Sequence, residues 1–106
     1  MASTILKSAA DLTTARVAVV TAAANKQTIV ITGTVSNLDT ANKASHFVTI
    51  EIQTGGTYRV ILKDAPVPYG GSLILPKIAM VSGDVMHMTA SANSVMQGYI
   101  SYVEKD

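Results

Sequence analysis

The sequence predicts an all-β protein: a single β-sandwich, jelly-roll or immunoglobulin-like, of about seven or eight antiparallel strands with an extended N-terminal arm. Short stretches rich in β-branched residues recur along the chain, and several alternate apolar and polar residues with a period of two. Turn-forming residues separate these stretches at spacings of roughly 8–12 residues. The segment from His46 to Leu75 adds a glycine turn and a proline-rich corner, which together form the hairpin and crossover of a sandwich.

The N-terminal segment is small, polar and weakly patterned, and we expect an arm over residues 1–14, followed by the sandwich domain over residues 15–106. Its apolar residues, Ile5, Leu6 and Leu12, are too few and too irregular to cover a sheet, although one short strand is expected around Ile5. A lone edge strand can pair with an unpaired strand edge of a neighbouring molecule. The arm is therefore predicted to be an assembly element outside the core, with a disordered or self-docked terminus as the alternative.

Two strands are predicted next, over residues 16–20 and 27–37, with Asn25 available for a left-handed position in the turn between them. One face of the longer strand is predicted to carry Ile29, Ile31, Gly33 and Val35. A glycine inside a strand indicates a bulge or a close approach by another backbone segment. The polar stretch over residues 37–45 is predicted to be a protruding loop.

A hairpin follows, in which Gly55 and Gly56 supply the two residues that tolerate positive φ in a two-residue turn. Its second strand leads into the corner over residues 64–71, where two prolines cannot donate to a central sheet and the chain must cross an edge or turn. The alternating residues predict a sandwich centre made of Ile29, Ile31, Val48, Ile50, Ile52, Val60 and Leu62.

The last third of the chain predicts four more strands, over residues 72–75, 78–81, 84–92 and 95–103. In the third of these, Met86, Met88 and Ala90 share one face. The last strand has apolar residues on both faces, so its orientation stays open, as in a strand covered on both sides.

Composition limits the function classes. The 106 residues suit one domain, and the absence of cysteine excludes disulfides and thiolate metal sites. A net charge of +1 argues against a nucleic-acid partner. Only 14% of the residues are charged, which favours neutral or apolar faces that meet other subunits, or else a surface covered by Ala, Ser and Thr. No signal-peptide pattern and no apolar run of membrane-spanning length is present, so we expect neither secretion by a signal peptide nor a membrane partner.

No catalytic, cofactor-binding or metal-binding residues are predicted, and we expect no enzyme activity. His46 and His87 show no spacing typical of a metal site, and the acidic residues have no paired partner in the sequence. The Gly-Gly pairs lack the helix start and lysine of a phosphate loop. A glycan- or host-surface-binding module is the alternative function. The chain contains no Trp and one Phe, so the aromatic candidates are Tyr58, Tyr69, Tyr99 and Tyr102.

Two segments resemble small β-sandwich proteins from the structural gene clusters of tailed bacteriophages. The first is the corner KDAPVPYGGSL over residues 63–73, and the second is GDVMHMTAS over residues 83–91, followed by SYVE near the C-terminus. The resemblance covers about half of the chain and carries no chemistry. It implies a non-enzymatic virion protein, of the capsid-decoration or neck/tail accessory type, whose partners are copies of itself and other virion proteins. The interface residues that the sequence predicts are Ile5, Leu6 and Leu12 of the N-terminal arm, together with Tyr69.

Overall fold

The computed structural model describes residues 3–105, and within this range all regular structure is β-strand, paired antiparallel throughout. The strands are β1 (Ser3–Asp11), β2 (Val17–Thr21), β3 (Gln27–Asn37), β4 (His46–Thr54), β5 (Thr57–Val67), β6 (Ser72–Leu75), β7 (Ile78–Met80), β8 (Val85–Ala90) and β9 (Met96–Lys105). The predicted all-β class is confirmed.

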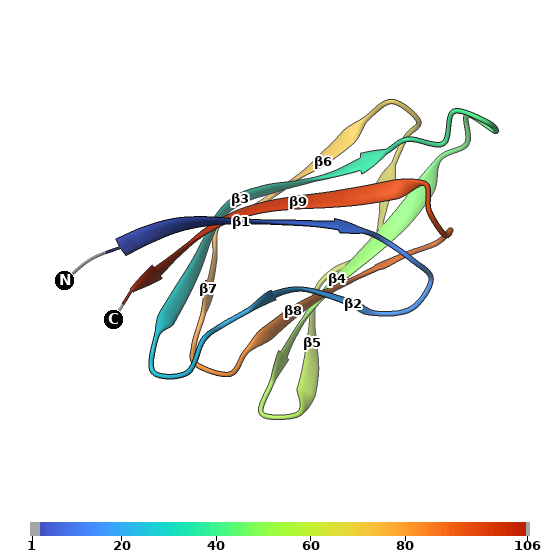
Figure 1. Ribbon diagram of the computed structural model, residues 1–106. Helices are drawn as coiled ribbons and strands as arrows, with labels where there is room; N and C mark the ends of the chain where they lie inside the picture. Colours follow the sequence, from blue (N-terminus) through green and yellow to red (C-terminus); the bar gives the residue numbers. More distant parts are fainter. Residues whose placement is uncertain (1–2, 106) are drawn as a thin grey trace.

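The strands form two sheets that pack as a sandwich (Figure 1). Sheet A has the order β1-β9-β3-β6, with β7 also paired with β3, and sheet B has the order β2-β8-β4-β5. The chain therefore pairs in nested fashion: β1 with β9, β2 with β8, β3 with β6 and β7, and β4 with β5. This nesting is that of a jelly roll, in which β6 and β7 count as one strand interrupted at Pro76. Of the two predicted arrangements, the jelly roll is the one observed.

The hairpin and the proline corner are as the sequence predicts. Gly55 and Gly56 have φ values of 57° and 83°, and they join β4 to β5. Pro66 lies in β5, the edge strand of sheet B. Proline has no backbone N–H to donate, and an edge strand tolerates this because it has a neighbouring strand on one side only. Immediately after β5 the backbone N–H of Gly71 donates to the carbonyl of Pro68, and the chain crosses to sheet A. The corner therefore connects the two sheets.

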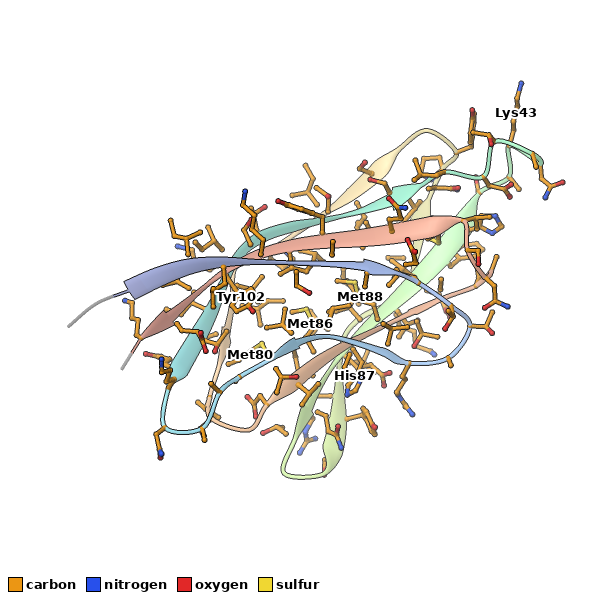
Figure 2. All side chains as sticks on the ribbon, in the orientation of Figure 1. Lys43, Met80, Met86, His87, Met88 and Tyr102 are labelled. Carbon is orange, nitrogen blue, oxygen red and sulfur yellow. The ribbon has the colours of Figure 1, made fainter. Side chains whose placement is uncertain are left out.

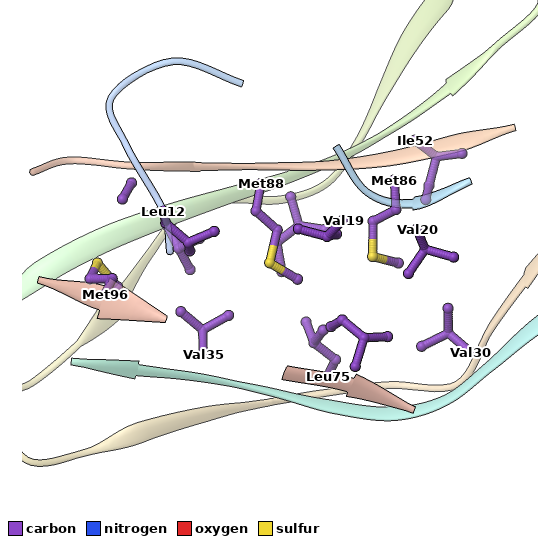
Figure 3. Packing of buried hydrophobic residues seen from close by; sticks show 14 of the residues in the cluster. Leu12, Val19, Val20, Val30, Val35, Ile52, Leu75, Met86, Met88 and Met96 are labelled. Carbon is purple, nitrogen blue, oxygen red and sulfur yellow. The ribbon is translucent and has the colours of Figure 1, made fainter. Parts of the chain in front are cut away.

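The core lies between the sheets and is rich in methionine (Figure 3). Met86 and Met88 share one face of β8 as predicted, and that face points inward; Figure 2 shows His87 on the opposite side of the strand. In β9 the inward residues are Met96, Gly98 and Ile100, which resolves the orientation that the sequence leaves open. The fully buried side chains include Leu12, Val30, Val35, Val48, Ile50, Val67, Met80, Met86, Met88, Met96 and Ile100.

Part of the predicted sandwich centre is wrong. Val48, Ile50 and Ile52 are buried as predicted, and Leu62 packs partly against the core. Ile31 and Val60, however, are 40% and 53% exposed. The remaining residue of that set, Ile29, also lies on the outer face of β3, where it is only partly buried.

A bulge explains the error in β3. The pairing of β3 with β9 shifts register between Val30 and Thr32, so Ile31 is an extra residue. Val30 points inward and is fully buried, while Gly33 and Val35 point inward beyond the bulge. The alternation from Ile29 to Val35 that the sequence suggests is therefore interrupted halfway.

The N-terminal segment is also different from the prediction. Instead of a short strand around Ile5, β1 is nine residues long and pairs with β9 from Ser3 to Asp11 without a register shift. Leu12 is fully buried, and its backbone N–H donates to the carbonyl of Met96. An arm outside the core is therefore the wrong description of these residues, because β1 completes sheet A and Leu12 fills the core.

Candidate interaction surfaces

The outer face of sheet A carries rows of exposed apolar side chains. Directly paired residues of neighbouring strands lie on the same face, so the strand register defines rows across the sheet. One row joins Ile5, Val103, Ile29 and Ala79, and another joins Ala9, Tyr99, Thr34 and Ile74. The exposed fractions are 69% for Ile5, 72% for Ile74 and 45% for Tyr99. This face therefore presents large apolar groups to its surroundings.

Small polar residues fill most of the remaining positions on the same face. Two further rows cross this face, one between the rows of Ile5 and Ile74 and one beyond the row of Ile74. Both contain mostly serine, threonine and glutamine. Across these four rows, Lys7 and Asp11 are the charged strand residues, and both belong to β1. An apolar face with few charges is typical of a surface that contacts another protein.

The free edge of β1 adjoins this face. β1 is the first strand of sheet A, and its other side has no strand partner among the described residues. Its nine consecutive pairs with β9 contain no bulge, and the strand contains no proline. Bulges, prolines, inward-pointing charges and edge lysines are the usual devices that prevent an edge from pairing with another chain. Of these, β1 carries only the exposed Lys7, so its backbone groups can accept a further strand that offers Lys7 an opposite charge.

The outer face of sheet B also exposes large apolar side chains, Phe47 at 46% and Val60 at 53%, but it carries a polar cluster whose groups bind one another. Nε and Nη2 of Arg16 donate to the two carboxylate oxygens of Glu51, at 2.9 and 3.3 Å. The guanidinium Cζ lies 3.8 Å from the ring centroid of Tyr58, and that ring contacts His87 at a centroid distance of 5.4 Å. The pKa of Glu51 is lower than usual, chiefly because Arg16 donates hydrogen bonds to it. The Glu51 carboxylate is therefore held as an anion that is already paired.

An open hollow of about 440 Å³ lies beside this cluster. Its lining comprises Thr14, Ala15, Arg16, Thr49, Glu51, Val60, Lys63 and Thr89. The lining includes no histidine, and its carboxylate is occupied by Arg16, so no nucleophile stands next to a free base. The arrangement offers polar contacts but no catalytic geometry that the described side chains can supply.

The two histidines have separate partners. His46 contacts Asp39 at 2.7 Å, and His87 contacts Gln53 at 3.2 Å. No group of three or more His, Asp or Glu side chains in the described part of the chain is placed to hold a metal ion. No helix within residues 3–105 is long and apolar enough to cross a membrane.

The structure separates the predicted interface residues. Ile5 lies on the outer face of sheet A near the start of β3, and the inward-facing Leu6 is half-buried. Tyr69 is 41% exposed in the corner at the far end of β3, since the neighbouring Gly70 bonds to Asn37. Leu12 has no exposed surface, so its assignment to an interface is wrong for the chain as folded.

Sequence reasoning missed four residues of the outer face of sheet A: Lys7, Asp11, Ile74 and Tyr99. The strand pattern of β9 contains the signal for Tyr99, because it alternates with the buried Met96, Gly98 and Ile100. Knowing that Gly98 faces inward would have been sufficient to choose the correct face. The partner strands of Lys7 and Asp11 follow only from the sheet order, which the sequence does not specify.

The likeness of this fold to a phage protein extends over the whole domain. A chain from the acidic stable capsid structure of Helicobacter pylori bacteriophage KHP30 superposes with a TM-score of 0.59 at 9% sequence identity. The match covers 98% of this chain and 87% of that chain. No family model matches the sequence, and no curated protein matches it. At this identity the likeness shows a common fold.

Proposed function

We propose that this protein is a non-enzymatic structural subunit of a tailed-phage virion, a capsid decoration protein or a neck/tail accessory protein that connects subunits. The observation that carries the proposal is the fold likeness to a chain of a phage capsid structure, which covers 98% of this chain. The likeness includes β1 and the proline corner, so it concerns the complete jelly roll rather than one hairpin.

Two further features support this role. The corner over residues 63–73 and the strand segment over residues 83–91 resemble phage structural proteins in sequence, independently of the fold comparison. The outer face of sheet A exposes large apolar side chains, as expected for a subunit that contacts copies of itself and other virion proteins. A virion location follows from the proposal.

The glycan-binding alternative receives less support from the structure. A stacking platform for a sugar needs an accessible aromatic ring. The guanidinium of Arg16 lies over the ring of Tyr58, at 3.8 Å from its centroid. Tyr69 is exposed, but it stands in a corner without a second aromatic partner among the ring contacts of the described residues.

Quantitative mass spectrometry of gradient-purified particles tests the proposal. We expect the protein in the particles in a fixed ratio to the major capsid protein, and retained after a high-salt wash that removes adsorbed host proteins. A ratio close to that of the capsid protein supports decoration, and a much lower ratio supports a neck or tail position. Absence from washed particles contradicts the proposal. A glycan array on which binding is lost in Tyr69→Ala would then favour the alternative.

A further inference from the structure

We infer that two copies of this chain join edge to edge through β1, around a two-fold axis at Ala9, so that sheet A continues from one molecule into the other. The inference rests on the proposed role as an assembly subunit and specifies the partner and the register. It starts from the unpaired, unbulged edge of β1. The occupant of that edge is identified by the charges that β1 carries.

Symmetry restricts the possible registers. Two identical strands that pair antiparallel are related by a two-fold axis normal to the sheet. Directly opposed residues must point to the same face, so the axis has to pass through a residue position and not between two positions. Ile5, Lys7, Ala9 and Asp11 all point outward, because their partners in β9 lie on the outer face.

One register is favoured by charge. With the axis at Ala9, Lys7 stands opposite Asp11 of the second copy, and Asp11 stands opposite the second Lys7. An axis at Lys7 or at Asp11 places like charges directly opposite each other, and an axis at Ser8 or Ala10 pairs neither charge with a charge. Oppositely charged pairs across an antiparallel ladder are stabilising and like charges are destabilising. The β1 sequence is therefore complementary to itself about Ala9.

The local structure leaves room for this contact. Ala9 is exposed and carries only a methyl group at the axis. Asp11 accepts a hydrogen bond of 3.1 Å from Nε2 of Gln97, one strand inward, which holds its carboxylate on the outer face. The inward residues Ser8 and Ala10 are small, and Oγ of Ser8 donates to the carbonyl of Val19 in β2. The main-chain hydrogen bonds of the added strand supply affinity, and the ion pairs select the register.

Sedimentation of the full chain over a range of concentrations tests the inference. We expect a reversible dimer for the parent. Lys7→Asp and Asp11→Lys each place like charges opposite each other at both symmetric positions, and each should raise the dimer Kd about tenfold. The double variant with both changes restores the opposite charges and should return the Kd to within about threefold of the parent.

Matched variants separate this contact from a general effect of charge. Lys77→Asp makes the same charge change at an exposed position between β6 and β7, on the other side of β3, and should leave the Kd unchanged. Ala9→Glu places two carboxylates at the axis and should abolish the dimer. Unchanged melting curves would show that the variants remain folded.

Three outcomes would overturn the inference: a parent that stays monomeric at about 200 µM, a Kd that neither single variant changes, or a double variant as weak as the single ones. The failure of the proposed virion role is distinguishable. A protein that dimerises as expected but is absent from particles contradicts the virion role alone, and one that is present in particles but monomeric contradicts the β1 contact alone.

Discussion

Nε2 of His46 donates a hydrogen bond of 2.7 Å to Oδ2 of Asp39, whose side chain is only 3% exposed. The contact joins Asp39, near the start of the loop between β3 and β4, to His46, the first residue of β4. Asp39 also accepts from the backbone N–H of Asn42, and its own N–H donates to Asn37. Nδ2 of Asn37 in turn donates to the carbonyls of Ala44 and Val67. Figure 2 shows Lys43 at the tip of this protruding loop.

The Asp39 contact predicts a loss of stability in acid. The pKa of Asp39 lies below its ordinary value of 3.8, first because His46 donates to the carboxylate and second because Asn42 does. A group whose pKa is lowered by folding stabilises the fold above its unfolded pKa, and this contribution is lost as the pH falls through its folded pKa. We expect urea unfolding to show the parent more stable than Asp39→Asn at pH 7, with the difference shrinking below about pH 5.

The variant Glu51→Gln serves as the comparison, since the pKa of Glu51 is also lowered, chiefly by the hydrogen bond from Arg16, which directly precedes β2 of the same sheet. It should show its own acid-dependent loss, and the two losses should add because the sites share no partner. The free energy of unfolding of the parent and that of Asp39→Asn could instead differ by the same amount from pH 7 to pH 3. That result would show that the charge of the Asp39 carboxylate does not stabilise the fold through this contact.

Gly33 is predicted to resist any larger residue. A Cβ at this position would lie 2.6 Å from Cδ1 of Ile100, 2.8 Å from Cδ1 of Leu75 and 3.2 Å from the carbonyl of Tyr99. Overpacking of this kind costs about 1–3 kcal/mol, so Gly33→Ala should lower the melting temperature by roughly 5–20 °C. Addition of Ile100→Val removes one of the two clashing methyl groups and should recover part of that loss. Equal melting of Gly33→Ala and the parent would contradict the packing at this bulged strand.

The sequence is sufficient to predict the strands whose two faces differ. In β8 the buried Met86, Met88 and Ala90 alternate with the partly exposed Val85, His87 and Thr89, so the prediction that the first three share one face is confirmed. The glycine turn and the proline corner are also predictable, because φ > 0 and a missing N–H are properties of single residues. These features suffice for an all-β sandwich.

The faces of β3 and β5 needed information that is not local. Residues 28–31 are all β-branched, so alternation cannot reveal which residue the bulge displaces. In β5 the two-residue turn already places Val60 opposite Glu51, on the outer face, and the extra residue Ile61 then returns Leu62 to the core side. The register of the hairpin would have corrected Val60, whereas the bulge at Ile61 is visible only in the folded chain.

Adjacent substitutions in β3 test the bulge. Val30→Asp places an unpaired charge among fully buried residues and should cost at least about 3 kcal/mol of the free energy of unfolding. Ile31→Asp places the same charge on the outer face, where 40% of the native side chain is exposed, and should cost less than about 1 kcal/mol. Circular dichroism during urea unfolding measures both. If Ile31→Asp lowered the free energy of unfolding more than Val30→Asp does, Ile31 would be the buried residue, as the alternation in the sequence suggests, and the bulge would be contradicted.

The final prediction concerns the role of the N-terminal segment. Leu12 is fully buried between the sheets, while Ile5, seven residues earlier, is 69% exposed on the outer face of sheet A. Leu12→Ala should cost about 2–5 kcal/mol, which is a large share of the stability of a small domain. Ile5→Ala removes a similar amount of hydrocarbon from the surface and should cost less than about 1 kcal/mol.

Deletion of residues 1–14 extends this comparison. It removes Leu12 together with every backbone contact between β1 and β9, so we expect it to destabilise the domain more than Leu12→Ala does. A segment that served assembly alone could be deleted with an unchanged melting temperature. If the deletion variant melts like the parent, then β1 and Leu12 contribute nothing to the fold. If it unfolds, oligomer loss on deletion cannot be assigned to the β1 edge, and the charge variants at Lys7 and Asp11 become the decisive measurement because they leave the core intact.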